Sequence, residues 1–185
     1  LGSADDAVSA VAVSADGRFV VSGGWDNRVT VWSLPRRVEL RRMEGPEGPV
    51  HAVAVSPDCR VVASAGEDGT VQLWDLAGGR RWRVLSGHDG AVHAVAFTPD
   101  GRLRSGSLSG LLLWDPDAGT SGILTPQPFF GVLGPDRRYV LGSVSPVGAS
   151  ISSENSVAVV YDLEERVSRE LPTHGNQVWY VAWHP

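Results

Sequence analysis

Short apolar runs separated by turn residues are the dominant pattern along this chain. The clearest example lies in residues 50–85, where four such runs follow one another at 50–55, 61–64, 70–74 and 81–85. β-Branched and apolar residues dominate the runs, and turn residues of the Pro-Asp and Asp-Gly type separate them, as is typical of strands joined by tight turns. No helical period competes with this pattern. The sequence therefore predicts an all-β protein of short antiparallel strands.

The same unit of runs and turns recurs along the chain. Its first turn contains an aspartate that recurs at intervals of 42, 42 and 36 residues, and its third run ends in an aromatic residue that recurs at 42, 40 and 47 residues. These residues are Asp16, Asp58, Asp100 and Asp136 in the turns, and Trp32, Trp74, Trp114 and Tyr161 in the runs. A period of about 40 residues that reads as several short strands predicts a β-propeller, in which four-stranded sheets called blades surround an axis.

The repeat divides the chain into four four-stranded units and the first strand of a fifth. The unit boundaries are approximately 5–43, 44–84, 85–124, 125–171 and 172–185, where the last is incomplete. Propellers close with about 4–8 blades, so we expect a fragment of a larger propeller rather than a four-bladed ring with a leftover strand. An open arc would expose the apolar flanks of its end blades, which predicts self-association or pairing with the remainder of the same propeller.

Several dipeptides that recur in phase with the turns resemble those of the WD-repeat (tryptophan–aspartate repeat) family of β-propellers. Trp74-Asp75 and Trp114-Asp115 close the second and third units, and Gly87-His88 opens the third. The first and fourth units close with Trp32-Ser33 and Tyr161-Asp162. The resemblance covers nearly the whole chain and implies, by analogy with the family, a parent propeller of seven blades.

The resemblance also implies a structural tetrad in each unit: a His, a Ser or Thr of the second strand, an Asp of the second turn and the Trp of the third strand. By position, its members are Ser22, Asp26 and Trp32, then Ser64, Asp68 and Trp74, then His88, Ser105 and Trp114. No unit is complete, because Ala4 and Pro46 replace the first two histidines and the third hairpin is two residues shorter and lacks the Asp. We therefore expect each buried polar member to have a substitute partner.

In this family one face of the propeller commonly binds proteins or peptides, through the starts of the first strands and the residues before the turn Asp. The predicted partner-binding residues are Trp25, His51, Glu67, His93, Phe129 and Trp179, with Ser9 at the matching position of the first unit. Large aromatic side chains are common anchors at interfaces. Trp25 lies in a hairpin turn that a core does not easily reach, so it either binds a partner or lies flat on a neighbouring loop.

Composition and charge favour some classes of partner and location over others. The chain has 185 residues, a net charge of −5, one cysteine, and 16 basic residues that are all arginine. The negative charge disfavours nucleic acid and anionic membranes as partners, because phosphate binding needs a basic face. The single Cys59 and the lack of a signal-peptide pattern or a long apolar stretch favour a cytoplasmic location. The arginine-only usage favours a bacterial source with GC-rich coding.

Three common catalytic motifs are absent from the sequence. It has no lysine for a phosphate-binding loop, no Gly-x-Ser-x-Gly and no His-Glu-x-x-His. The histidines and the cysteine lack metal-ligand spacing, and the first strands carry few ionisable groups. We therefore predict a non-catalytic protein-interaction scaffold without a metal or cofactor. The alternatives are a propeller enzyme whose active residues lie in other blades, and the sensor lobe of a multidomain regulatory protein.

Two further features allow a structural and a functional interpretation. Arginines cluster around the fourth strands of the first two units: Arg36, Arg37, Arg41 and Arg42, then Arg80, Arg81 and Arg83. They either protect strand edges from pairing, which we favour, or form a basic rim for an acidic partner. The fourth unit replaces its second turn with a long loop, residues 145–155, which either has drifted or takes part in binding.

Overall fold

The computed structural model describes residues 6–125, 130–133, 139–144, 157–162, 165 and 167–170. These residues form sixteen β-strands and no helix, and therefore no helix that could cross a membrane. The strands pair as four antiparallel sheets of four strands each. The predictions of an all-β fold and of one four-stranded sheet per unit are confirmed. The predicted strand of a fifth unit and the loop at 145–155 lie outside the described residues.

Each sheet is a simple meander whose strands pair in chain order. The first contains β1 (Val8–Val13), β2 (Phe19–Gly24), β3 (Arg28–Ser33) and β4 (Val38–Glu44). The second contains β5 (Val50–Val55), β6 (Val61–Gly66), β7 (Thr70–Asp75) and β8 (Arg81–Ser86). The third contains β9 (Val92–Phe97), β10 (Leu103–Ser107), β11 (Gly110–Asp115) and β12 (Thr120–Thr125). The fourth contains β13 (Phe130–Leu133), β14 (Tyr139–Val144), β15 (Val157–Asp162) and β16 (Val167–Glu170).

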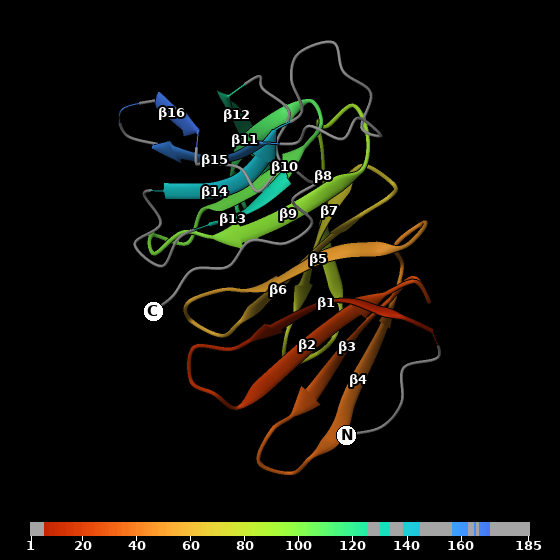
Figure 1. The fold of residues 1–185 in the computed structure, drawn as a ribbon. Helices are drawn as coiled ribbons and strands as arrows, with labels where there is room; N and C mark the ends of the chain where they lie inside the picture. Colours follow the sequence, from red (N-terminus) through yellow and green to blue (C-terminus); the bar gives the residue numbers. More distant parts are fainter. Residues whose placement is uncertain are drawn as a thin grey trace.

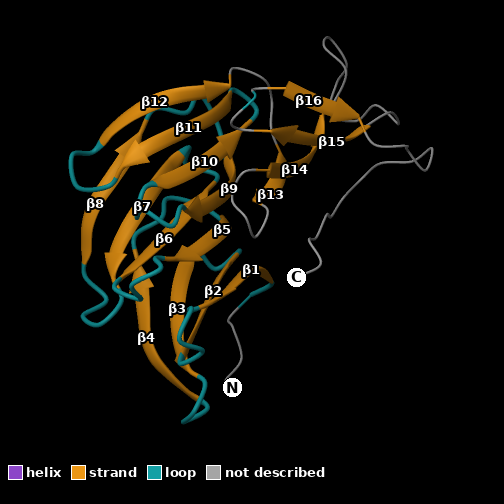
Figure 2. Ribbon diagram, turned by 90° about the vertical axis from the view of Figure 1, so that its left-hand side faces the viewer, coloured by secondary structure: helices purple, strands orange, loops and turns teal. Residues whose placement is uncertain are grey.

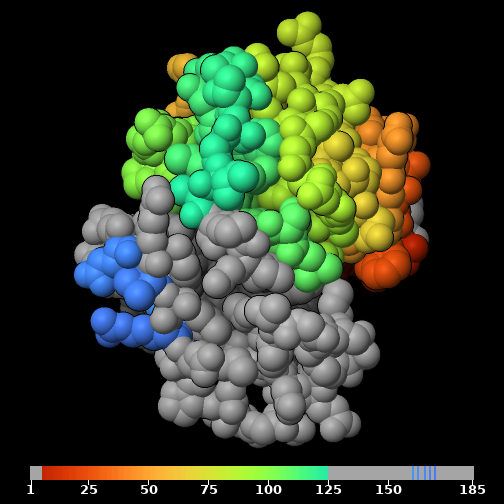
Figure 3. Space-filling model, turned by 90° about the horizontal axis from the view of Figure 1, so that it is seen from above, coloured from red at the N-terminus to blue at the C-terminus, as the bar shows by residue number. Residues whose placement is uncertain are grey.

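The sheets follow one another in sequence order and fan out around one side of an axis. The first three sheets are stacked from bottom to top in Figure 1. In Figure 2 the strands β1, β5 and β9 lie on the inner side of the fan, and β4, β8 and β12 lie on the outer side. The first strands of neighbouring sheets contact each other. Seen from above, the colours run in sequence order from orange to teal, so consecutive sheets are neighbours (Figure 3). This arrangement is that of blades in part of a propeller.

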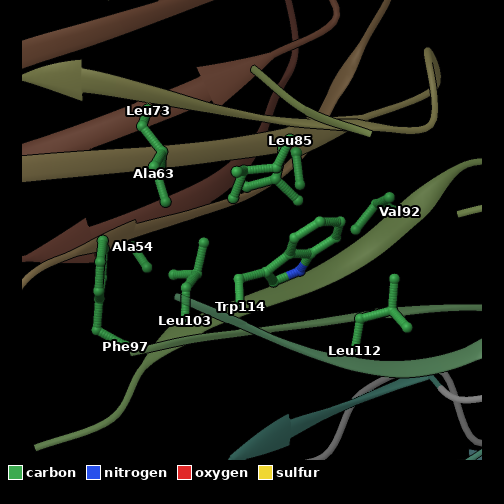
Figure 4. Packing of buried hydrophobic residues seen from close by; sticks show 11 residues of the cluster. Ala54, Ala63, Leu73, Leu85, Val92, Phe97, Leu103, Leu112 and Trp114 are labelled. Atoms are coloured by element: carbon green, nitrogen blue, oxygen red, sulfur yellow. The ribbon is translucent and has the colours of Figure 1, made fainter. Parts of the chain in front are cut away.

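Two hydrophobic clusters fill the spaces between neighbouring sheets. The cluster between the first and second sheets contains Val21, Val29, Val31 and Met43 on one side and Val50, Val53, Val62, Trp74 and Leu76 on the other. The cluster between the second and third sheets contains Ala54, Ala63, Ala65, Val71, Leu73 and Leu85 against Val92, Phe97, Leu103, Leu112 and Trp114 (Figure 4). The second sheet is thus covered on both faces, which explains its nearly continuous apolar strands.

The repeated aspartate closes the first turn of each of the first two sheets. Asp16 Oδ1 accepts hydrogen bonds from Ser14 Oγ at 2.6 Å and from the backbone N–H of Arg18 at 3.0 Å. Asp58 Oδ1 accepts from Ser56 Oγ at 2.6 Å in the same way. The serine hydroxyls hold the pKa of both carboxyl groups below its usual range. These carboxylates stabilise turns, which is the role that their position in the repeat predicts.

Arginines of the outer strands connect neighbouring sheets at two equivalent places. Arg83 of β8 donates from Nη2 to the carbonyl oxygen of Asp117 at 2.8 Å, and its guanidinium occupies the space that a Cβ at Gly119 would need. Arg41 of β4 lies beside Gly79 in the same way, 3.0 Å from where its Cβ would be. Protection of strand edges therefore does not fully explain the arginine clusters, because the side chains of Arg41 and Arg83 pack between neighbouring blades.

Candidate binding face

A β-bulge near the start of each of the first three sheets presents one residue outside the regular pairing. The extra residue is Ser9 in β1, His51 in β5 and His93 in β9, because the register shifts across each of them. A bulge bends its strand and changes the direction of a side chain, and bulges are common beside functional sites. The Ser9 hydroxyl is used within the fold, since it donates to the carbonyl oxygen of Val50 in the next sheet.

His51, Glu67 and His93 form one contact cluster across two sheets. The imidazole rings of His51 and His93 are stacked, with centroids 4.9 Å apart and planes 28° apart. His51 Nε2 lies 2.9 Å from Glu67 Oε2 in the β6–β7 turn. The Glu67 side chain is 61% exposed, whereas that of His51 is 18% exposed, so the carboxylate remains available to a ligand. Burial and the nearby His51 lower the pKa of His93, whereas Glu67 acts to raise it.

Trp25 lies in the β2–β3 turn and is 57% exposed. Its backbone N–H donates to the carbonyl oxygen of Ala7 at 3.0 Å, which ties this turn to the start of β1. Asn27 completes the turn with a positive φ of 60°. More than half of the Trp25 surface is open to solvent, so a neighbouring loop does not cover the indole. It is the most exposed tryptophan among the described residues.

Contacts between turns place these residues on one continuous face. The side-chain amide of Asn27 satisfies its hydrogen bonds when its nitrogen faces Gly48, and in that orientation it donates to the carbonyl oxygen of Gly48 at 3.2 Å. A Cβ on Gly48 would in turn lie 3.2 Å from Cβ of Glu67. Each hairpin turn thus reaches the linker that enters the next sheet. Of the six predicted partner-binding residues, the structure places Trp25, His51, Glu67 and His93 here, whereas Phe129 and Trp179 lie outside the described residues.

Two serines take part in the polar network of the third sheet, where the tetrad lacks its Asp. Trp114 Nε1 donates to Ser105 Oγ at 2.6 Å, and that hydroxyl lies 2.6 Å from His88 Nε2. Ser107 Oγ lies 2.8 Å from His88 Nδ1 and 2.7 Å from Ser109 Oγ. Burial lowers the pKa of His88, which favours a neutral ring with a hydroxyl partner on each nitrogen. Sequence reasoning did not find this substitution, because Ser107 at the end of β10 and Ser109 in the shortened turn stand at no motif position.

Gln72 is the partner of the turn Asp68 in the second sheet, where Pro46 stands at the histidine position. Trp74 Nε1 donates to Ser64 Oγ at 2.9 Å. The buried Gln72 donates from Nε2 to Asp68 Oδ2 at 3.2 Å and accepts at Oε1 from Arg81 Nη1 at 3.0 Å. Arg81 also lies over the Trp74 ring, 5.9 Å from its centroid. Arg81 is therefore part of this network and not a free rim charge.

The first sheet contains the same contact between the second and third strands. Trp32 Nε1 donates to Ser22 Oγ at 2.9 Å. Asp26 Oδ1 accepts from the backbone N–H of Arg28 at 3.1 Å, which fixes the turn that carries Trp25. Ala4, at the histidine position, lies outside the described residues. Across the described ranges, no group of three or more His, Cys, Asp or Glu side chains is arranged to hold a metal ion.

The sheets, their shared axis and the buried Trp–Ser pairs define the class of protein as a β-propeller built from tryptophan-containing blades. The family described as WD domain, G-beta repeat, matches residues 1–33, 37–75 and 79–115. The chain belongs to this WD40 repeat family. The matched residues include Trp25, His51, Glu67 and His93, and every strand of the first three sheets except β12.

Solved structures of WD40 proteins share this fold. The structure titled "Structure of U3-55K" is 18% identical, with a TM-score of 0.72 over 92% of this chain and 53% of that chain. "Crystal structure of RRP9 WD40 repeats" is 16% identical, with a TM-score of 0.74 over 94% of this chain and 53% of that chain. The chain thus spans about half the length of both, consistent with a partial propeller. No curated protein matches its sequence.

Proposed function

We propose that this protein is a non-catalytic interaction module that binds a protein or peptide on the face carrying Trp25. WD40 repeat proteins generally act as protein-interaction scaffolds. The observation that carries the proposal is the 57% exposed indole of Trp25 on the same face as the cluster of His51, Glu67 and His93. An exposed indole adds little to folding, whereas a buried one at an interface is a frequent source of binding energy.

The use of polar groups within the described sheets supports a binding role over a catalytic one. His88 has hydroxyl partners on both ring nitrogens, and the turn aspartates Asp16 and Asp58 are occupied by hydroxyl and N–H donors. A general acid or base must reach a substrate proton with a free ring nitrogen or oxygen. The cluster around Glu67 lies on an open face, which suits a peptide better than a small substrate that must be enclosed.

The test compares two exposed tryptophans. The intact protein, Trp25→Ala and Trp82→Ala are used to capture binding proteins from a lysate of the source organism, with quantitative mass spectrometry. Trp82 of β8 is 37% exposed and lies on an outer strand, so it is a matched control for loss of an indole. The proposal predicts a partner lost with Trp25→Ala and kept with Trp82→Ala, at an unchanged melting temperature. Equal capture by both variants would contradict it.

A further inference from the structure

Charge is unequally distributed between the two ends of the blades. The turns and linkers at the Trp25 end comprise residues 6–7, 25–27, 45–49, 67–69, 87–91 and 108–109. They contain six acidic residues and no arginine: Asp6, Asp26, Glu47, Glu67, Asp68 and Asp89. The turns at the opposite end comprise residues 14–18, 34–37, 56–60, 76–80, 98–102 and 116–119. They contain six arginines and four aspartates. The Trp25 face is therefore strongly negative, even with Arg81 counted, whose guanidinium donates to the carbonyl oxygen of Gly45. The opposite face is close to neutral, because the exposed Asp75 and Asp115 end strands beside its turns.

Several carboxylates at the Trp25 end are not neutralised within the fold. Asp68 is used internally, because it accepts from the backbone N–H of Glu47 at 3.1 Å and from Gln72. The exposed side chains of Glu47, Glu67 and Asp89 have no arginine within ion-pair distance in the described part of the chain. The partner of Glu67 is His51. The open carboxylates of Glu47 and Asp89 therefore accompany the exposed indole, together with Glu67, which contacts His51 but has a side chain that is 61% exposed.

We propose that the occupant of this face is a cationic peptide segment, with an arginine or lysine over the Trp25 indole and neighbouring basic residues near Glu47 and Glu67. This proposal rests on the proposed function and adds the chemistry of the partner. The face of an indole attracts a guanidinium or ammonium group within about 6 Å of its centroid. The open carboxylates would steer such a segment to the face and discriminate against acidic ones. The same charges repel nucleic-acid phosphates.

The arrangement of turns matches the needs of an extended ligand. The Trp25 turn reaches the linker at Gly48, and Gly48 lies against Glu67. The next turn repeats the pattern, because a Cβ on Gly69 would lie 3.1 Å from the carbonyl oxygen of Gly90. The indole and the carboxylates of Glu47, Glu67 and Asp89 thus lie on successive connected segments across three sheets. A peptide lying across the blades would meet the aromatic anchor and then several negative charges.

The test uses synthetic peptides and matched charge variants. Binding of the intact protein to a fluorescein-labelled alanine–arginine repeat peptide, and to its alanine–glutamate counterpart, is measured by fluorescence anisotropy. Trp25→Ala and the double variant Glu47→Gln/Glu67→Gln should each weaken binding of the arginine peptide by about fivefold or more. The control Asp115→Asn/Asp117→Asn removes two charges from the opposite end and should leave affinity unchanged. Affinity should also fall as salt rises from about 0.05 to 0.3 M.

Several outcomes would overturn the cationic ligand. They are no binding of the arginine peptide, equal or tighter binding of the glutamate peptide, equal weakening by the control variant, and direct binding of a fluorescein-labelled single-stranded oligonucleotide to the protein in the absence of peptide. Capture of a partner from lysate with the same variants distinguishes failure of the cationic-ligand proposal from failure of the proposed function. If the captured partner is lost with Trp25→Ala but still binds Glu47→Gln/Glu67→Gln, the binding face is supported and the cationic ligand is contradicted. If the partner still binds Trp25→Ala, both the binding face and the cationic ligand are contradicted.

Discussion

Cys59 occupies a turn position that is glycine in two other sheets. Its φ is 58°, and the equivalent Gly17 and Gly101 have φ of 67° and 85°. A side chain at positive φ costs about 1 kcal/mol, so Cys59→Gly should raise the free energy of unfolding by up to about 1 kcal/mol. Urea denaturation measures the change. Cys59→Ala keeps the backbone strain and should give no gain, so equal stabilisation by both variants would show that the strain is absent.

Two partly buried histidines make stability depend on pH. Burial lowers the pKa of His88 and His93 below the usual imidazole value of about 6.5. As pH falls from about 7.5 to 5.5, the unfolded chain takes up protons that the folded chain resists, so the free energy of unfolding should decrease. Urea denaturation across this range measures it. His88→Gln should flatten the dependence, whereas a stability that is constant or rises on acidification would contradict this account.

At the scale of the structural element, the strands could be predicted from sequence and the polar partners could not. The apolar runs at 50–55 and 70–74 correspond to β5 and β7. They could be predicted because a sheet with a core on both faces needs apolar residues along the whole length of each strand. Gln72 and Ser107 were missed, because neither stands at a motif position. In the structure Gln72 hydrogen-bonds Asp68 and Arg81, and Ser107 hydrogen-bonds His88. Such substitutions depend on which side chains meet across strands, and spacing alone does not determine that.

The contact between Arg83 and Gly119 couples the second blade to the third. Gly119→Ala should destabilise the protein by about 1–3 kcal/mol, because its φ is 72° and a Cβ would collide with the Arg83 guanidinium. Gly101→Ala is the control, since its φ is 85° but its Cβ would have nothing within 4 Å. A double-mutant cycle with Arg83→Ala, followed by chemical denaturation, separates the collision from the backbone term. Strict additivity in this cycle would exclude the collision.

At the scale of the whole molecule, the first blade exposes an apolar strand. Val11 and Val13 of β1 are 61% and 58% exposed, although they belong to the innermost strand of their sheet. Exposed apolar patches favour association. We therefore expect the 185-residue chain to self-associate. Light scattering coupled to size-exclusion chromatography tests this expectation, and a monodisperse monomer with a cooperative melt would contradict it.

The positions of the candidate site residues could be predicted from the sequence, but the charge of the surface that they share could not. The repeat identified equivalent positions, so His51 and His93 could be paired by number before their stacking was known. The exposure of Trp25 followed from its place in a short turn. The negative charge of the whole face could not be read in the same way, because it depends on which turns share one end of the blades. That assignment required the order and direction of the strands.

The central claim is that the turns at the Trp25 end form the recognition surface. Hydrogen–deuterium exchange of the intact protein, with and without the partner captured through Trp25, tests this most directly. We predict that bound partner slows exchange in residues 24–27, 47–51 and 66–69 and leaves the opposite turns at 34–37 and 76–80 unchanged. Protection confined to those opposite turns would contradict the claim.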